Sequence, residues 1–373
     1  MNTIFLSYAE SHSIKWVNAL AEKGHKVYFI IQRNKNNHVE WVDHRVTVIT
    51  LPFSGKIGYI LNAPFLKALE RKIKPDICNV HYMSGFGTMA RLAKLKTIVA
   101  SVWGADVYDF PYKNKICMQI IRKNLLNAKI ICSTSNCMAA QVRKLIGSRR
   151  DIIVTPFGVD IDTFSNDDSD KKVDESIVIG NVKVLNPKYG IDDLLKAFAL
   201  LRDELKSDPV NEHIADILRC HIYGDGEQRH ELEELAKDLD IDKFVTFFGE
   251  IAHSAVPEAL KTIDIFCATS VLDSESFGVS VVEAESMGLP VVVTDVDGFK
   301  EVVEDGMTGI IVERENISSI KDALLRLVLD PDERIRMGKN GRKRVETLYD
   351  FKNNVTQMES AYARAKEQGE QNE

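Results

Sequence analysis

Short apolar runs alternate with amphipathic stretches along both halves of the 373-residue chain. In the first half, the runs have the length of buried strands. Helical spacing of apolar residues separates them, as in residues 14–23, which end at Gly24, and in residues 65–72. This alternation predicts a parallel sheet with crossover helices. The predicted strands are residues 3–7, 26–31, 46–51, 77–81, 97–102, 129–133 and 152–155.

A polar stretch interrupts this pattern at residues 160–176, and we interpret it as a linker. The alternation then restarts with a strand and with a helix at residues 192–205, whose opening Asp192 and Asp193 suit a helix N-terminus. Two α/β units in tandem predict a cleft between two domains, with ligands beyond the carboxyl ends of the strands. The strands predicted here are residues 176–184, 219–223, 245–248, 263–268, 290–294 and 309–312, and a last helix is predicted at residues 351–366.

Charge is distributed unevenly between the two halves. The chain has a net charge of −7, yet residues 1–165 carry 23 Lys/Arg against 11 Asp/Glu, and the remainder carries 25 against 44. A basic first domain would favour an anionic membrane surface or acceptor. Uneven solvated charge without a function is the alternative.

The start of the chain and the cysteines indicate a cytoplasmic protein. The opening residues have no basic start and no cleavage pattern, so a first strand fits them better than a signal peptide. No run approaches 18 apolar residues, so we expect no spanning helix. The six cysteines are scattered without a CxxC pair, which predicts free thiols and no zinc site.

The most informative segment is residues 273–288. Gly278 follows a polar loop and precedes an amphipathic helix, so a ligand could approach the backbone closely there. The N-terminus of that helix would offer free N–H groups to a phosphate. Glu275 and Glu283 would lie on either side, where carboxylates can accept hydrogen bonds from hydroxyl groups. A nucleotide sugar has this order of groups: sugar, diphosphate, ribose.

This segment resembles the donor signature of the retaining family-4 glycosyltransferases. The two glutamates are eight residues apart, and the first is followed by Ser276, Phe277 and Gly278. The second opens a Glu-Ala-x-x-x-Gly-x-Pro pattern that ends at Pro290. The match continues to Gly309, and the motif Pro156-Phe157-Gly158-Val159-Asp160 resembles the end of the family's first domain.

Other family landmarks follow in order, some of them altered. Lys183 and Lys188 resemble the basic pair that grips the donor diphosphate, although the family usually has Arg at the first place. Gly224 lies in a glycine-rich turn after a strand, and the pair Phe248-Gly249 ends another strand, at the place where the family's backbone contacts the nucleobase. In the first domain, Trp103 stands where the family commonly has a histidine, and Asp106 keeps its place. The paired glycines of the family's first loop are missing, and His12 lies there instead.

The resemblance implies a GT-B fold: two Rossmann-like domains that face each other across a cleft, with a C-terminal helix that crosses back to the first. The implied ranges are 1–165 for the acceptor, 166–348 for the donor and 349–373 for the helix. The catalytic candidates are Glu275, Lys188, Lys183 and Asp106. The donor-binding candidates are Glu283, Gly278, Phe277, Val279, Ser276, Gly224, Phe248 and Gly249, and the acceptor-side candidates are His12, His81 and Trp103.

The implied activity is transfer of a hexose, with retention, from a nucleotide-diphosphate sugar of the UDP type to a glycan or lipid-linked sugar. No Asp-x-Asp motif is present, so we expect neither a catalytic metal nor a cofactor. We expect no nucleic-acid partner, and a peripheral place on the inner face of the cell membrane would suit the basic first domain. Taken singly, each site residue could instead be a surface lysine, a turn glycine, a helix-capping aspartate or an ordinary histidine.

Other functions stay open at this point. A nucleotide-sugar epimerase or a phosphorylase could share the donor signature, and so could a non-catalytic nucleotide-sugar-binding protein. A dehydrogenase would use similar domains, but no G-x-G-x-x-G follows a predicted strand.

Overall fold

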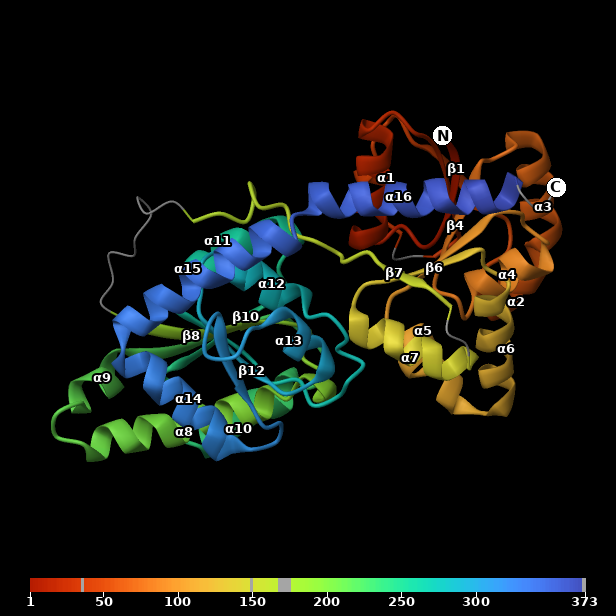
Figure 1. Cartoon of the computed structure of the whole chain (residues 1–373). Helices are drawn as coiled ribbons and strands as arrows, with labels where there is room; N and C mark the ends of the chain where they lie inside the picture. The colour runs from red at the N-terminus through yellow and green to blue at the C-terminus, as the bar shows by residue number, and fades with distance from the viewer. Residues whose placement is uncertain (35–36, 148–149, 167–175, 371–373) are drawn as a thin grey trace. The chain divides into compact units, whose positions relative to one another are not determined.

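The computed structural model describes residues 1–34, 37–147, 150–166 and 176–370, and it divides into two compact units (Figure 1). The first unit comprises Met1–Phe157 and Lys352–Glu373, and the second comprises Gly158–Phe351. The domain boundaries predicted after residues 165 and 348 stay predictions. Residues 167–175 of the predicted linker lie outside the described part of the chain.

The first unit is built on a parallel sheet with the strand order β3-β2-β1-β4-β5-β6-β7. Every strand predicted in this half is present, and its ends differ from the prediction by at most one residue. The strands are β1 (Asn2–Leu6), β2 (Lys26–Gln32), β3 (Thr47–Leu51), β4 (Ile77–His81), β5 (Ile98–Val102), β6 (Ile130–Ser133) and β7 (Ile152–Val154).

Helices cover both faces of this sheet. Two helices of this half were predicted by residue range, and α1 and α3 lie at those places. The structure adds others, among them α2, where Gly55 and Gly58 weaken the helical pattern. The helices are α1 (Ser11–Glu22), α2 (Gly55–Leu61), α3 (Ala63–Ile73), α4 (Phe86–Leu92), α5 (Ala105–Tyr108), α6 (Lys115–Leu126), α7 (Asn136–Ile146) and α16 (Phe351–Glu370), with short 3-10 turns η1 (Val39–Trp41) and η2 (Phe110–Lys113).

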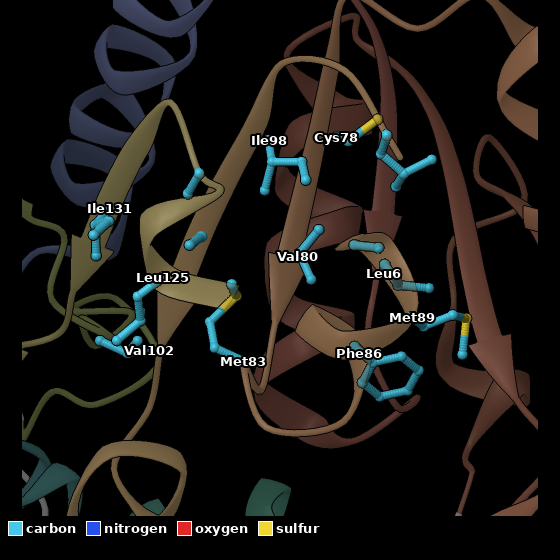
Figure 2. Packing of buried hydrophobic residues seen from close by; sticks show 14 of the residues in the cluster. Leu6, Cys78, Val80, Met83, Phe86, Met89, Ile98, Val102, Leu125 and Ile131 are labelled. Atoms are coloured by element: carbon cyan, nitrogen blue, oxygen red, sulfur yellow. The ribbon is translucent and has the colours of Figure 1, made fainter. Parts of the chain in front are cut away.

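One apolar layer lies between this sheet and the helices α4 and α6. Figure 2 shows Phe86 and Met89 of α4 beside the strand residues Leu6 and Val80, with Leu125 of α6 further along the same layer. All five side chains are fully buried. Strands that are covered on both faces become continuous apolar runs, which is why the sequence revealed them clearly.

The second unit repeats the architecture with the strand order β10-β9-β8-β11-β12-β13, again all parallel. Its strands are β8 (Ile177–Val182), β9 (Leu218–Tyr223), β10 (Val245–Gly249), β11 (Ile265–Ala268), β12 (Val291–Thr294) and β13 (Gly309–Val312). Its helices are α8 (Ile191–Ser207), α9 (Glu212–Ile217), α10 (Arg229–Asp238), α11 (Val256–Lys261), α12 (Val279–Ser286), α13 (Asp297–Val302), α14 (Ile317–Leu329) and α15 (Pro331–Leu348), with η4 (Pro187–Tyr189) and η5 (His253–Ala255).

Each sheet reverses its strand order at one place. In the first unit this place lies between β1 and β4, and in the second between β8 and β11. The loops that leave the carboxyl ends of these strands diverge to opposite sides of the sheet. Ligands of doubly wound folds bind in the crevice that this divergence opens.

The last helix, α16, completes the first unit although it follows the second unit in the sequence. Its fully buried Tyr362 donates a hydrogen bond from its hydroxyl to Asn79 Oδ1 of β4 at 3.1 Å. Glu359 accepts bonds from Lys23 Nζ and pairs with His25 Nε2, at 2.8 and 2.9 Å. In the part of the chain that the structure describes, no helix is long and apolar enough to cross a membrane.

We expect Tyr362→Ala to destabilise the first unit by about 3–5 kcal/mol, because it leaves a large cavity. Tyr362→Phe should cost only about 1 kcal/mol, the worth of one hydrogen bond. All three tryptophans, Trp16, Trp41 and Trp103, lie in the first unit, so tryptophan fluorescence during urea unfolding reports on this unit alone. The exposed Gln357→Ala on the same helix is the control. Equal midpoints for Tyr362→Ala and the control would contradict the anchoring role.

Candidate functional site

An ion pair lies where the strand order of the second unit reverses. Lys183 directly follows β8, and Glu275 lies in the loop between β11 and α12. The Lys183 Nζ and Glu275 Oε2 atoms are 2.6 Å apart, and both side chains are mostly buried. Burial alone would lower the pKa of the Lys183 ammonium, but the Glu275 carboxylate outweighs it and raises this pKa. Lys183 is therefore a permanent cation held at the crevice.

A second lysine, Lys188, shares an aromatic neighbour with Lys183, the ring of Tyr189. The Nζ atoms of Lys183 and Lys188 lie 4.4 and 4.7 Å from the centre of the Tyr189 ring, which is a cation–π distance for both. Tyr189 thus links the two lysines. The loop is fixed by Thr269, whose hydroxyl donates to the Gly190 carbonyl oxygen at 2.7 Å.

The N-terminus of α12 opens beside this pair. Gly278 precedes the helix with φ 84° and ψ 58°, a left-handed conformation that favours glycine. The first backbone N–H groups of a helix have no partner inside it, and they carry partial positive charge. The loop before the helix packs so tightly on Gly298 that a Cβ there would lie 2.3 Å from the Glu275 carbonyl oxygen. Backbone packing thus fixes the loop that carries Glu275.

Glu283 lies in the second turn of α12 and is almost fully buried. Its Oε1 atom is 2.7 Å from Nε2 of His253, a half-exposed side chain in η5 after β10. His253 was not predicted, since a single histidine after a strand carries no pattern. The pairing means that a ribose hydroxyl at Glu283 would lie next to an imidazole.

The ends of β9 and β10 form another side of the crevice. Gly224 follows β9, and a Cβ there would lie 1.9 Å from the Lys183 carbonyl oxygen, so only glycine fits. Phe248 is 46% exposed and stacks on Tyr223 with ring centres 4.3 Å apart. Gly249 ends β10 with φ 79° and accepts a hydrogen bond from Gly224 N at 2.8 Å. These residues present a flat aromatic and backbone surface.

In the first unit, aromatic side chains gather beyond β1, β4 and β5. Trp103 contacts the rings of His81, Tyr82 and Phe157, with centres 4.3, 5.4 and 5.2 Å apart. His12 lies half-buried against Phe157 at 4.5 Å. Trp103, which stands where the family commonly has a histidine, thus packs against neighbouring aromatic rings.

His81 is fully buried, and burial lowers its pKa to about 3. Its Nε2 atom is 2.6 Å from Asn79 Oδ1, and its ring stacks on Phe5. The imidazole is therefore neutral and belongs to the core. A contact between His81 and an acceptor, as predicted, would require the surrounding rings to move.

Asp106 is buried as well, and its carboxylate is occupied by the backbone. Oδ2 accepts from Met83 N at 3.0 Å, and Oδ1 accepts from Trp103 N and Gly104 N at 3.2 and 3.1 Å. Burial raises its pKa, while these bonds act in the opposite direction. Asp106 holds the turn after β5, and its predicted contact with a hydroxyl group would compete with these bonds. The roles of the individual site residues stay predictions.

Tyrosines and one glutamate near this cluster were not predicted. Tyr82 donates from its hydroxyl to Glu10 Oε2 at 2.8 Å, and the hydroxyl groups of Tyr8 and Tyr59 form a hydrogen bond with each other. Tyr82 has φ 55°, which is unusual for a bulky residue. No sequence motif marks these residues, because they come together only through the strand order.

Two family models match the chain. The model of "Glycosyl transferases group 1" matches residues 162–344, and that of "Glycosyl transferase 4-like" matches residues 4–135. The two family models and the sequence relatives together show a glycosyltransferase that uses a nucleotide sugar. The chain belongs to the family-4-type glycosyltransferases, as the sequence motifs predicted.

Similar proteins differ in what they act on. The chain is 25% identical over 365 residues to the N-acetyl-alpha-D-glucosaminyl L-malate synthase of Bacillus anthracis. This alignment covers 92% of this chain and 90% of that protein. It is 28% identical over 268 residues to the GDP-mannose-dependent alpha-(1-6)-phosphatidylinositol monomannoside mannosyltransferase of Mycolicibacterium smegmatis. This alignment covers 69% of this chain and 67% of that protein.

Solved structures show the GT-B fold. Anabaena HepE in complex with UDP superimposes with a TM-score of 0.80 at 16% identity and covers 97% of this chain and 100% of that chain. Sucrose-phosphate synthase from Thermosynechococcus elongatus reaches a TM-score of 0.81 at 18% identity, with 98% and 99% covered. The predicted GT-B fold with two Rossmann-like domains is confirmed.

We expect Gly298→Ala to weaken nucleotide-sugar binding by at least about tenfold, because the new methyl group would push the Glu275 loop away. Isothermal titration calorimetry with a nucleotide sugar that binds the wild-type protein measures this change in affinity. Gly306→Ala is the control, because its Cβ meets nothing within 4 Å. Its φ of +71° strains the backbone, a strain that Gly298→Ala lacks, so any general loss of stability should be larger in the control. Equal affinities of the two variants would contradict the proposed tight packing.

A second expectation concerns Glu285 on α12. Its side chain is fully buried, and burial raises its pKa to about 8 from the ordinary 4.5, while Thr308 and Arg344 act in the opposite direction. The folded state therefore holds a proton that the unfolded chain releases. The protonated Glu285 therefore adds to the free energy of unfolding. This contribution is complete below pH 4.5 and is lost, at up to about 1.4 kcal/mol per pH unit, as the pH rises towards 8.

Glu285→Gln should remove this loss, so its unfolding free energy relative to wild type should rise between pH 5 and pH 8. Urea unfolding followed by circular dichroism measures it, and tryptophan fluorescence should show no change, since all tryptophans lie in the other unit. The exposed Glu250→Gln is the matched control. A constant difference between Glu285→Gln and wild type over this range would refute the buried protonated carboxyl.

Proposed function

We propose that the protein is a retaining glycosyltransferase that moves a hexose from a nucleoside-diphosphate sugar to a glycan or a lipid-linked sugar, in cell-surface polysaccharide or glycolipid synthesis. The observation that carries the proposal is the Lys183–Glu275 pair beside the N-terminus of α12. One cation, one carboxylate and one helix start meet there, at the place where the strand order reverses.

The diphosphate would lie between Lys183, Lys188 and the first N–H groups of α12. Its negative charge grows as the glycosidic bond breaks, and fixed positive groups stabilise that charge most in a site that excludes water. A phosphate next to Lys183 would share the ammonium with Glu275. The Glu275 carboxylate is then oriented to accept hydrogen bonds from hydroxyl groups of the sugar.

The nucleoside would extend from α12 towards β10. Glu283 is placed to accept from the ribose hydroxyl groups, and the Phe248-Gly249 segment would contact the base. We favour a UDP sugar, and HepE, a structural neighbour, is known in complex with UDP and with UDP-glucose. The mannosyltransferase relatives are GDP-mannose-dependent, so the donor test must include both nucleotides.

Retention would need no covalent nucleophile from the protein. The acceptor hydroxyl would attack from the face that the diphosphate leaves, and a diphosphate oxygen would take its proton. Because Lys183, Lys188 and the helix N-terminus already neutralise the diphosphate, we propose a metal-independent reaction. We assign acceptor binding to residues 1–165 and donor binding to residues 166–348, with residues 349–373 returning to the first domain. A cytoplasmic protein on the inner face of the membrane suits this proposal.

The first experiment finds the donor. UDP and GDP sugars are screened by thermal shift, and the sugar that stabilises the protein is then incubated with glycan and lipid-linked acceptors. Nuclear magnetic resonance of the product should show the anomeric configuration of the donor. Epimerised donor without an acceptor would indicate an epimerase, and binding without turnover would indicate a non-catalytic protein; each result would overturn the proposal.

We expect Lys183→Ala and Glu275→Ala each to lower kcat by about a hundredfold or more, because each removes a group that holds the reacting part of the donor. The matched controls are Lys237→Ala and Glu234→Ala, which break an exposed pair on α10 with an N–O distance of 2.7 Å. Initial rates at saturating donor measure the effect. Rates near wild type in both site variants would contradict the assignment.

A further inference from the structure

An apolar face points outward on the helices α2 and α3 of the first unit. The two helices form one bent helix, because Asn62 between them is helical and its carbonyl accepts from Leu66 N at 2.9 Å. Ile57, Ile60, Leu61 and Phe65 follow the spacing of one helical side, and they are 69%, 58%, 45% and 48% exposed. An amphipathic helix on a globular protein normally turns this side inward.

The face is held rigidly. The buried Asn62 side chain accepts from Phe53 N and donates to the Phe53 carbonyl at 3.1 and 2.8 Å, and Gln32 Nε2 donates to the Gly55 carbonyl at 2.8 Å. At Gly58, a Cβ would lie 2.0 Å from Gln32 Nε2, so glycine permits this close approach. The helix pair also packs against α4 (Figure 1). The apolar side chains are therefore presented by an ordered segment.

Phe53 extends the apolar surface beyond the helices. It is 41% exposed, and its ring lies edge-on to Phe65 with centres 5.9 Å apart. We call Phe53, Ile57, Ile60, Leu61 and Phe65 the α2–α3 face. Contiguous exposed patches of this kind mark interaction sites for proteins or membranes.

Cations flank the α2–α3 face at both ends. Lys56 is exposed at the start of α2, and Arg71, Lys72 and Lys74 are exposed at the end of α3. The acidic residue of this segment, Glu70, is buried and paired with Lys67. Apolar and aromatic side chains between basic ends are typical of helices that lie in the interface of an anionic bilayer.

We propose that the α2–α3 face docks the protein on an anionic lipid bilayer. A second copy of the chain fits less well, because a two-fold contact on this face would bring the basic ends of both copies together. The inner side of α2 also carries Tyr59, which bonds to Tyr8 beyond β1, in the aromatic cluster of the first unit. That the bilayer would hold a lipid-linked acceptor near this cluster rests on the proposed function; the docking itself does not.

The test uses the full chain in flotation with phosphatidylcholine vesicles that contain or lack phosphatidylglycerol, at low and high salt. Wild type should float with the anionic vesicles. The variant Ile57→Ser/Ile60→Ser/Phe65→Ser should lose at least about tenfold in partitioning, and Lys56→Gln/Arg71→Gln/Lys72→Gln roughly fivefold per charge at low salt. The matched controls are Ile116→Ser/Leu126→Ser on α6, 72% and 50% exposed, and Arg143→Gln/Lys144→Gln on α7.

Controls that float like wild type would support the proposal. It is overturned if wild type stays with the soluble fraction, or if the controls lose as much binding as the face variants. It is also overturned if sedimentation velocity without vesicles shows a dimer that the serine variant abolishes. Thermal shift with the bound nucleotide sugar should be unchanged in the serine variant, so a failure of docking and a failure of the donor assignment are distinguishable.

Discussion

Close backbone packing between neighbouring loops fixes the loops that carry Lys183 and Glu275 in the donor half of this molecule. Glycines allow the loops after β8, β9, β11 and β12 to touch through their main chains. A Cβ at Gly190, Gly224 or Gly298 would lie within 2.3 Å of a carbonyl oxygen in the adjacent loop. Lys183 and Glu275 therefore meet because their backbones are held, and the ion pair itself needs little adjustment when a charged ligand competes for it.

The strands and the donor signature could be predicted from the sequence because each is local. Buried parallel strands leave apolar runs, and the segment from Glu275 to Pro290 keeps its meaning at fixed spacing. The partners of these residues could not be predicted. His253 reaches Glu283 across 30 positions, and Tyr189 joins two lysines only after the η4 turn forms. Such contacts depend on strand order, which a sequence pattern does not contain.

In the acceptor half, less of the site could be predicted from the sequence than in the donor half. Its candidates were chosen by resemblance at single positions, and the structure gives several of them packing or capping contacts. His81 is a neutral core histidine, Asp106 holds three backbone N–H groups, and Trp103 sits among other rings. The exposed α2–α3 face also escaped prediction, since two glycines obscured the helix and apolar residues are expected to be buried.

The place of α16 has a consequence for how the protein is made. The first unit takes its last helix from the end of the chain, so the ribosome has synthesised the whole second unit before Tyr362 exists. Domains fold as they emerge, and the usual order starts at the N-terminus. Here the N-terminal sheet must wait, with the site for α16 on β4 uncovered, while the second unit can already be complete. The second unit is thus the part of the chain that can finish folding first.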